Sequence, residues 1–238
     1  MAMTFRRGFY DGIPICLGYI SVSFTFGMMA VEGGLPIWMA VLISMTNLTS
    51  AGQLAGLGII LAGGSFAELA VTTFIINLRY MLMSFSLSQK VERNMSIAKR
   101  MGVAFGITDE IFAVSMQQPS FFNFKYFTGL LCTPYFGWTM GTLLGAGAAQ
   151  LLPTSIRMAL GIAIYGMFLA IIIPPARKSK PVLLVIAVSS VLSCIFKYTT
   201  FLQKLSSGWV IIICAIVASG IGACLYPINE ATDGEEAK

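Results

Sequence analysis

The chain has 238 residues, of which 57% are hydrophobic and only 11% charged, and its mean hydropathy is +0.83. A soluble domain carries about 25% charged residues, so this composition excludes a soluble globular protein. The net charge of +5 does not indicate a nucleic-acid partner, because Lys and Arg fall in short gaps between apolar runs, where they orient a protein in the bilayer. We predict an all-α, polytopic integral membrane protein of the cell (inner) membrane, in contact with membrane lipid and with no nucleic-acid partner.

Histidine is absent from the chain, and the five cysteines lie inside apolar runs without metal-ligand spacing. Histidine-based metal sites, Ser-His and Cys-His catalysis and histidine proton relays are therefore ruled out. The cysteines are interpreted as small buried hydrophobes. We expect no catalytic residue, no metal and no cofactor.

Seven or eight hydrophobic segments are predicted, and one or two of them are broken or re-entrant. In chain order they cover residues 13–31, 35–62, 66–87, 101–116, 126–152, 157–175, 182–196 and 209–226. The first is longer than a signal-peptide core and is expected to be retained. Together they form a single transmembrane domain over 1–238, with an acidic tail at 227–238 that is expected to be disordered.

The basic loops set the parity of the crossings. Loops 89–100 and 176–181 are short and basic, and Arg6 and Arg7 precede the first segment, so all three regions are predicted to be cytoplasmic. Two regions on the same side of the membrane are separated by an even number of crossings. Because three segments lie between each pair of successive basic regions, one segment in each half is predicted not to cross. The candidates are 35–62, folded as two half-helices, and either 101–116 or the segment that contains Pro134.

A weak internal repeat, 7–88 and 100–175, would agree with this division. Pro36 precedes Ser50–Leu54 by about the distance at which Pro134 precedes the small-residue run that ends in Gln150-Leu151. Repeats of this kind, parallel or inverted, are common in transporters.

The polar stretch Met45–Gln53 interrupts the second segment. Lipid cannot satisfy its hydroxyl and amide groups, so they face either protein or a watery cavity, and such an interruption points to a transporter's binding site. The alternative is a helix that uses small residues for close packing and lets hydroxyls bond to its own backbone. The predicted substrate-binding residues are Asn47, Ser50, Ala51, Gly52, Gln53 and Asn77.

Three ionisable residues, Arg79, Asp109 and Glu110, are assigned to the interior of apolar segments, where such groups usually face a cavity or a partner. The two acids point about 100° apart on a helix, so one can pair with Arg79 while the other titrates. A carboxyl group desolvated in a bundle can gain and lose a proton near neutral pH, so the three are predicted to couple transport to protons. The alternatives are an Arg79 that snorkels to the interface and acids that only cap a short helix.

Four short motifs resemble the AzlC-type branched-chain amino acid exporters, the large subunit of a two-protein export system. They are Gly12-Ile13-Pro14 with Phe26-Gly27, the run Thr49–Leu54, Asn77-Leu78-Arg79, and Thr108–Ala113, and the resemblance covers about residues 5 to 175. It implies a permease that exports branched-chain or related small amino acids, driven by the proton gradient, together with a small hydrophobic AzlD-type subunit.

Two positions depart from the family pattern. Tyr80 stands where the family usually has His, and Thr49-Ser50 stand where it usually has Ala-Gly. These changes bear on the identity of the solute more than on the fold. Two alternatives belong to other classes: a membrane-embedded enzyme using Asp109 and Glu110 as an acid/base pair, and a structural or assembly subunit.

Overall fold

The computed structural model describes residues 3–149 and 151–226, and within α8 it leaves undescribed the side chains of 154, 157, 158, 160, 161, 163–165, 167, 168, 170 and 171. The helices are α1 (Phe5–Glu32), α2 (Ile37–Thr46), α3 (Ser50–Leu61), α4 (Phe66–Ser88), α5 (Ile97–Phe105), α6 (Asp109–Met116), α7 (Phe124–Ala148), α8 (Thr154–Lys178), α9 (Lys180–Tyr198), the 3₁₀ turn η1 (Leu202–Lys204) and α10 (Ser207–Leu225). The expected all-helical architecture is confirmed. Gln150 and the acidic tail lie outside the described residues.

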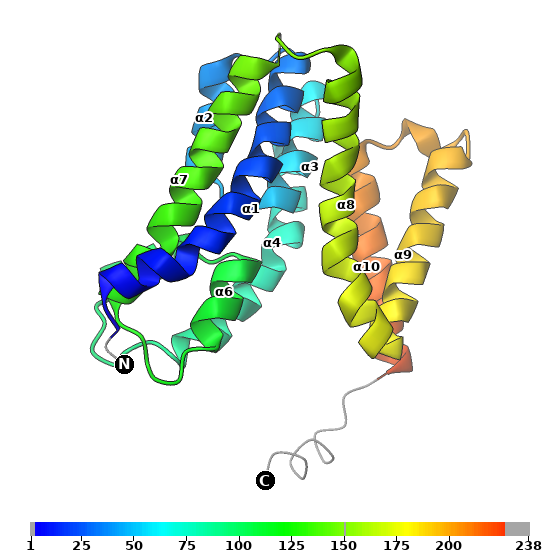
Figure 1. Ribbon diagram of the computed structural model, residues 1–238. Coiled ribbons are helices and arrows are strands. Elements are labelled where there is room, and N and C mark those ends of the chain that lie inside the picture. Colours follow the sequence, from blue (N-terminus) through cyan, green and yellow to red (C-terminus); the bar gives the residue numbers. More distant parts are fainter. Residues whose placement is uncertain (1–2, 150, 227–238) are drawn as a thin grey trace.

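The long helices run roughly side by side (Figure 1). Among the described residues, α1, α4, α9 and α10 are long and apolar enough to cross a membrane. Helices α7 and α8 have 25 residues each, more than the ~20 that a bilayer requires. The segment predicted to end at Pro174-Pro175 instead continues through both prolines to Lys178.

The second hydrophobic segment does not cross. Helix α2 ends at Thr46, the chain is extended at Asn47 and Thr49, and α3 begins at Ser50. The side chain of Leu61, at the end of α3, lies against Gly33, just before the start of α2. The α2–α3 pair is therefore a re-entrant hairpin, as the parity argument predicted, and α4 returns to the end at which α1 began (Figure 1).

A second break lies within 101–116, where the sequence pattern indicated one short segment. Helix α5 ends at Phe105 and α6 begins at Asp109, with Thr108 in an extended conformation between them. At the far end of α6 the Lys90 ammonium donates to the carbonyl oxygen of Met116 over 2.6 Å. The α5–α6 pair is thus a second re-entrant hairpin, which enters from the end that carries the basic loop.

The start of α1 and the two basic regions, 89–100 and 176–181, lie at one end of the molecule, the lower end of the helices in Figure 1. Arg7 donates to the Gln118 side chain over 3.0 Å, and Asn123 donates to the carbonyl oxygen of Met3 over 2.9 Å. These contacts join the start of α1 to the segment between α6 and α7. We name this the basic end.

Pro36 and Pro134 occupy unlike elements. Pro36 is the N-cap of α2, at the mouth of a hairpin, whereas Pro134 lies within the long helix α7. Each proposed half holds one hairpin and two long helices, but in a different order. The internal repeat therefore stays a prediction.

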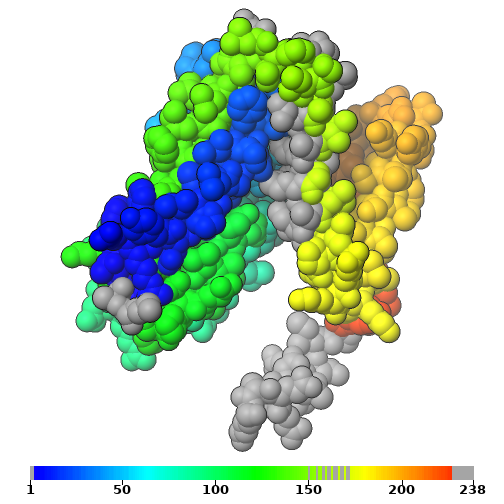
Figure 2. Space-filling view, in the orientation of Figure 1, coloured from blue at the N-terminus to red at the C-terminus, as the bar shows by residue number. Residues whose placement is uncertain are grey.

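Helices α1 and α7 form the central pair, and they pack through their smallest residues. Gly129, Thr133, Gly137, Gly141 and Gly145 recur every four residues along α7, which places them on one face. A Cβ atom at Gly145 would collide with the backbone oxygen of Phe24, and one at Gly8 with that of Tyr126. Close backbone approach of this kind drives helix association in lipid, where no hydrophobic effect acts between helices. The surfaces of α1 and α7 meet along their length in Figure 2.

Helix α10 is joined to α4 by Glu68, a buried acid that the sequence argument did not count among the ionisable residues inside the membrane. Its side chain is 4% exposed. It accepts hydrogen bonds from the Ser206 hydroxyl and, over 3.1 Å, from the backbone N–H of Gly208. The carboxylate thus caps the amino terminus of α10, where the helix dipole favours a negative charge.

Candidate functional site

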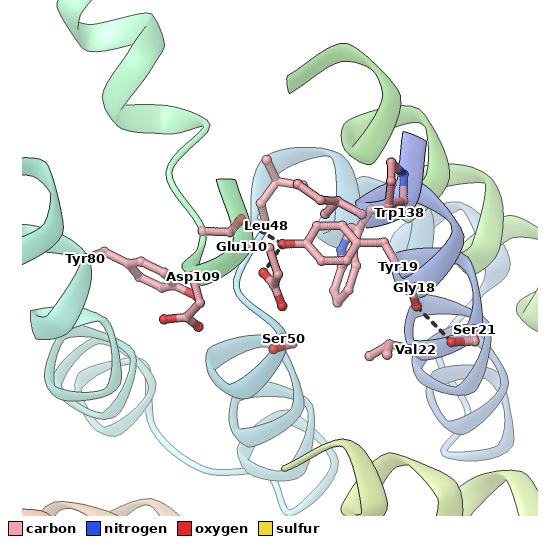
Figure 3. Close-up of a pocket in the computed structure, with 13 residues that line it drawn as sticks. Gly18, Tyr19, Ser21, Val22, Leu48, Ser50, Tyr80, Asp109, Glu110 and Trp138 are labelled. Atoms are coloured by element: carbon pink, nitrogen blue, oxygen red, sulfur yellow. Dashed lines mark hydrogen bonds between the residues drawn. The ribbon is translucent and has the colours of Figure 1, made fainter. Parts of the chain in front are cut away.

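A cavity of about 460 Å³ lies where the tips of the two hairpins meet, a volume within the range of small-molecule sites. Its described lining comes from five helices and both breaks, and comprises Pro14, Ile15, Gly18, Tyr19, Ser21, Val22, Leu48, Ser50, Tyr80, Thr108, Asp109, Glu110 and Trp138. Both half-helices that begin at the breaks, α3 and α6, present their amino-terminal ends to this space (Figure 3).

The two amino-terminal ends differ in charge. Helix α3 has no acidic residue in its first turn, and Thr49, its N-cap, makes no side-chain capping bond. The first N–H groups of a helix have no intrahelical partner and carry a partial positive charge, so this end suits an anionic group. Helix α6 is capped by Thr108, whose hydroxyl accepts from the N–H of Ile111, and it carries Asp109 and Glu110 in its first turn. This end suits a cationic group.

The two carboxylates point to different partners. Asp109 forms an ion pair with Arg79, 2.8 Å from an oxygen to Nη1. An oxygen of Glu110 lies 2.6 Å from the Tyr19 hydroxyl, which is also 2.7 Å from the Thr108 hydroxyl. In Figure 3 the Glu110 side chain lies between Tyr19 and Asp109. Arg79 does not simply snorkel to the interface, because its guanidinium pairs with α6 and stacks on the Tyr80 ring, 4.8 Å from its centroid.

Of the six predicted binding residues, only Ser50 lines the cavity. Asn47 shapes the break, since its side-chain oxygen accepts from the N–H of Thr49 over 3.2 Å. Asn77 lies against Gly52 at the start of α3, because a Cβ atom added to Gly52 would be 3.3 Å from the side-chain oxygen of Asn77. Ala51 is half-buried and outside the lining.

Gln53 corrects the expectation of a cavity-facing amide. It is 2% exposed and lies behind the cavity wall, where its Nε2 donates to the Ser44 hydroxyl over 2.6 Å and its Oε1 accepts from the Trp138 indole over 3.1 Å. The Ser44 hydroxyl lies 2.7 Å from that of Thr142. Gln53 therefore ties the α2–α3 hairpin to α7, with its hydrogen-bonding groups satisfied inside the protein.

Several lining residues were not predicted from the sequence. Tyr19 and Trp138 are aromatic residues within hydrophobic runs, and no local signal separates them from lipid-facing neighbours. Leu48 lies inside the polar stretch Met45–Gln53 but, as an apolar residue, was not counted among the binding residues. Trp138 packs edge-on against Tyr19, with ring centroids 5.2 Å apart. With Ile15 and Val22 they form an apolar wall beside the two polar helix ends.

Two re-entrant hairpins lie within a bundle of long helices, and the breaks at their tips line a cavity. This arrangement defines the class of protein, a membrane protein with a transporter-like site. The AzlC protein family matches residues 14–152, which span most of α1, both hairpins and all of α7. The chain belongs to the AzlC family, as the motifs indicated.

The curated relatives are membrane proteins. An uncharacterized membrane protein of Archaeoglobus fulgidus is 33% identical over 172 residues, covering 71% of this chain and 75% of the relative. Inner membrane protein YgaZ of Escherichia coli is 26% identical over 185 residues, covering 74% and 75%, and an uncharacterized membrane protein of Helicobacter pylori is 27% identical over 149 residues, covering 60% and 63%. No solved structure matches significantly. The protein is an AzlC-family membrane protein with a transporter-like role.

Proposed function

We propose that this protein is a permease that exports branched-chain or related small amino acids, driven by the proton gradient. The observation that carries the proposal is the pair of helix amino-terminal ends at one cavity, one bearing free amides and the other bearing two carboxylates. An amino acid carries one charge of each sign on two groups bonded to the same carbon atom, and this cavity offers a complement for both.

The α-carboxylate would lie at the start of α3. Backbone N–H groups at a helix start are a ready anion site, and the Ser50 side chain lines the cavity beside them. No acidic residue in this turn opposes the anion. The unwound backbone before Ser50 serves to bring these groups to the middle of the bundle.

The ammonium group would lie at the start of α6. Asp109 already has a cationic partner in Arg79, so Glu110 is the carboxylate available to a second cation. The aliphatic side chain of the substrate would then contact the wall formed by Leu48, Trp138 and Val22. A wall of this kind selects an apolar side chain by excluding water from it.

A small hydrophobic AzlD-type subunit is proposed as a partner, as the family resemblance implies. Exposed apolar side chains on α9 and α10, including Leu183, Val191, Ile195 and Ile216, offer a face for another membrane helix or for lipid. The chain is therefore to be reconstituted both alone and together with such a subunit.

Counterflow in proteoliposomes tests the function. Vesicles preloaded with unlabelled leucine should accumulate labelled leucine transiently, with or without the small subunit. Isopentylamine, which lacks the carboxylate, and 4-methylpentanoate, which lacks the ammonium group, should compete poorly because each loses one of the two helix ends. Ser88→Ala, on the exposed end of α4, serves as the control variant. Absence of counterflow for every small amino acid under both conditions would reject the permease and favour an assembly subunit, and chemical conversion of the solute would favour the enzyme.

A further inference from the structure

Asp109 and Glu110 face groups that differ in their ability to accept a hydrogen bond. The Arg79 guanidinium, which faces Asp109, has only donors and keeps its charge at all relevant pH values. Arg79 donates through Nη2 to the Tyr80 hydroxyl over 3.1 Å, and its buried Nε has no partner. Protonation of Asp109 would leave this guanidinium without a counter-charge, so the pair is held in its ionised form.

The Tyr19 hydroxyl, which faces Glu110, can both donate and accept. With Glu110 ionised, Tyr19 donates to the carboxylate, and Thr108 donates to Tyr19 while still accepting from the N–H of Ile111. With Glu110 protonated, its O–H donates to Tyr19, and Tyr19 donates to Thr108. The same three oxygen atoms are therefore hydrogen-bonded in both states, and only the direction of the bonds reverses.

The groups that face Glu110 include one cation, which is already paired. The titratable and charged ones among the described residues are Tyr19 on α1, Tyr80 and Arg79 on α4, and Asp109 beside it. The cation among them is committed to Asp109. Helix α3 and helix α7 contribute Ser50 and Trp138 to the cavity, which do not ionise near neutral pH.

We propose that Glu110 is the single exchange group of the transport cycle and binds a proton and the substrate ammonium alternately. Tyr19 is the positioning residue that keeps the carboxyl group hydrogen-bonded in both states, and the Asp109–Arg79 pair stays charged throughout. This inference rests on the proposed function and deepens it. A carboxylate that has bound a proton has no charge left for the ammonium, so the proton and substrate compete, and one proton enters for each substrate that leaves.

Competition at one carboxyl group has a measurable signature. Below the pH at which Glu110 ionises, the dissociation constant of leucine should fall about tenfold for each unit rise in pH. Glu110→Gln should bind leucine more weakly but with a flat pH dependence, because its amide cannot ionise. Because binding is weaker, this variant should catalyse leucine counterflow only at higher leucine concentrations, and it should lose accumulation driven by a pH difference. Tyr19→Phe should keep the slope and move its midpoint, since it changes the hydrogen bonding of Glu110 but removes no titrating acid.

The matched control is the neutral pair Arg79→Gln with Asp109→Asn, which removes both charges together and should retain the wild-type slope. A flat profile for this double variant, with an unchanged slope for Glu110→Gln, would assign the proton to Asp109 and overturn the inference while leaving the permease intact. A wild-type protein without leucine counterflow would reject the proposed function instead.

A measurement on the unmodified protein covers the case in which a variant fails to fold. Leucine added to weakly buffered, purified protein should displace protons into solution, approaching one per leucine bound at low pH and vanishing at high pH. Saturable leucine binding with no proton release at any pH would overturn the inference.

Discussion

The indole N–H of Trp138 donates to the side-chain oxygen of Gln53 over 3.1 Å, and this bond joins the central helix α7 to the broken hairpin α2–α3 behind the cavity. The Trp138 ring also packs against Tyr19, which contacts Glu110 and Thr108 on the other hairpin. The two hairpin tips are thus connected through side chains in contact, from the buried Gln53 amide through Trp138 and Tyr19, both of which line the cavity, to the start of α6.

Gln53→Leu is expected to destabilise the protein, because it leaves the Trp138 N–H and the Ser44 hydroxyl without their partner in a buried site. The cost should be about 1–3 kcal/mol, seen as a lower midpoint of thermal unfolding in detergent, together with reduced transport. Gln89→Leu, at the exposed end of α4, is the control. Loss of transport with unaltered unfolding would instead place the Gln53 amide in direct contact with the solute.

Cysteine labelling tests the arrangement of the hairpins. In a background without the native cysteines, Ser96→Cys and Ser179→Cys should react with an impermeant reagent from the same face of the membrane, because both lie at the basic end. Thr200→Cys, between α9 and α10, should react from the opposite face. We expect the shared face to be cytoplasmic, and opposite labelling of positions 96 and 179 would contradict a non-crossing hairpin.

Gly145→Val should disrupt the contact of α1 with α7, because the added side chain would overlap the backbone of Phe24. Overpacking in a close contact costs about 1–3 kcal/mol, so the folded yield and thermal midpoint should fall. Gly147→Val is the matched control in the same helix, since no atom lies within 4 Å of the position its Cβ would take. Equal effects of both substitutions would point to helix propensity rather than to packing.

Glu68→Leu should loosen α10 from α4 by removing the acceptor for Ser206 and for the N–H of Gly208. Loss of a helix cap costs about 0.5–2 kcal/mol, and the prediction is faster protease cleavage between α9 and α10 with leucine binding retained. Glu92→Leu, in the basic loop, provides the comparison. Unchanged cleavage in Glu68→Leu would show that α10 is held by other contacts.

Arg79→Gln alone should harm the protein more than Arg79→Gln combined with Asp109→Asn, because the single change leaves a carboxylate without its counter-charge. Both side chains are about one-third exposed, 36% and 30%, so solvent screening keeps the difference to about 1 kcal/mol. Thermal unfolding of the two single variants and the double variant measures the coupling directly. Additive effects would show that the ion pair contributes little.

Much of the architecture follows from local pattern alone. Continuous apolar runs identify the long helices, and the polar run before Gln53 marks the first break, because lipid cannot satisfy its amide and hydroxyl groups. The parity of the basic loops predicts that one segment in each half does not cross. The break at Gly106–Thr108 was not predicted, because the apolar pattern of segment 101–116 is that of one short helix. Only the structure shows that both ends of this segment lie on the same side of the molecule.

The site was only partly accessible from the sequence. Position along the chain shows that Asn47, Gln53 and Asn77 are polar residues within apolar segments, but not which of them faces the cavity and which packs against another helix. That choice depends on how α7 approaches the hairpin, and α7 approaches closely because its glycines allow backbone contact with α1. The sequence by itself thus determined the class of protein, its family and the two carboxylates of the site. Tertiary packing alone decided that Asp109 meets Arg79 and that Glu110 meets Tyr19. The members of these two pairs are 30 and 91 residues apart in the sequence, and they meet only because the hairpin tips converge.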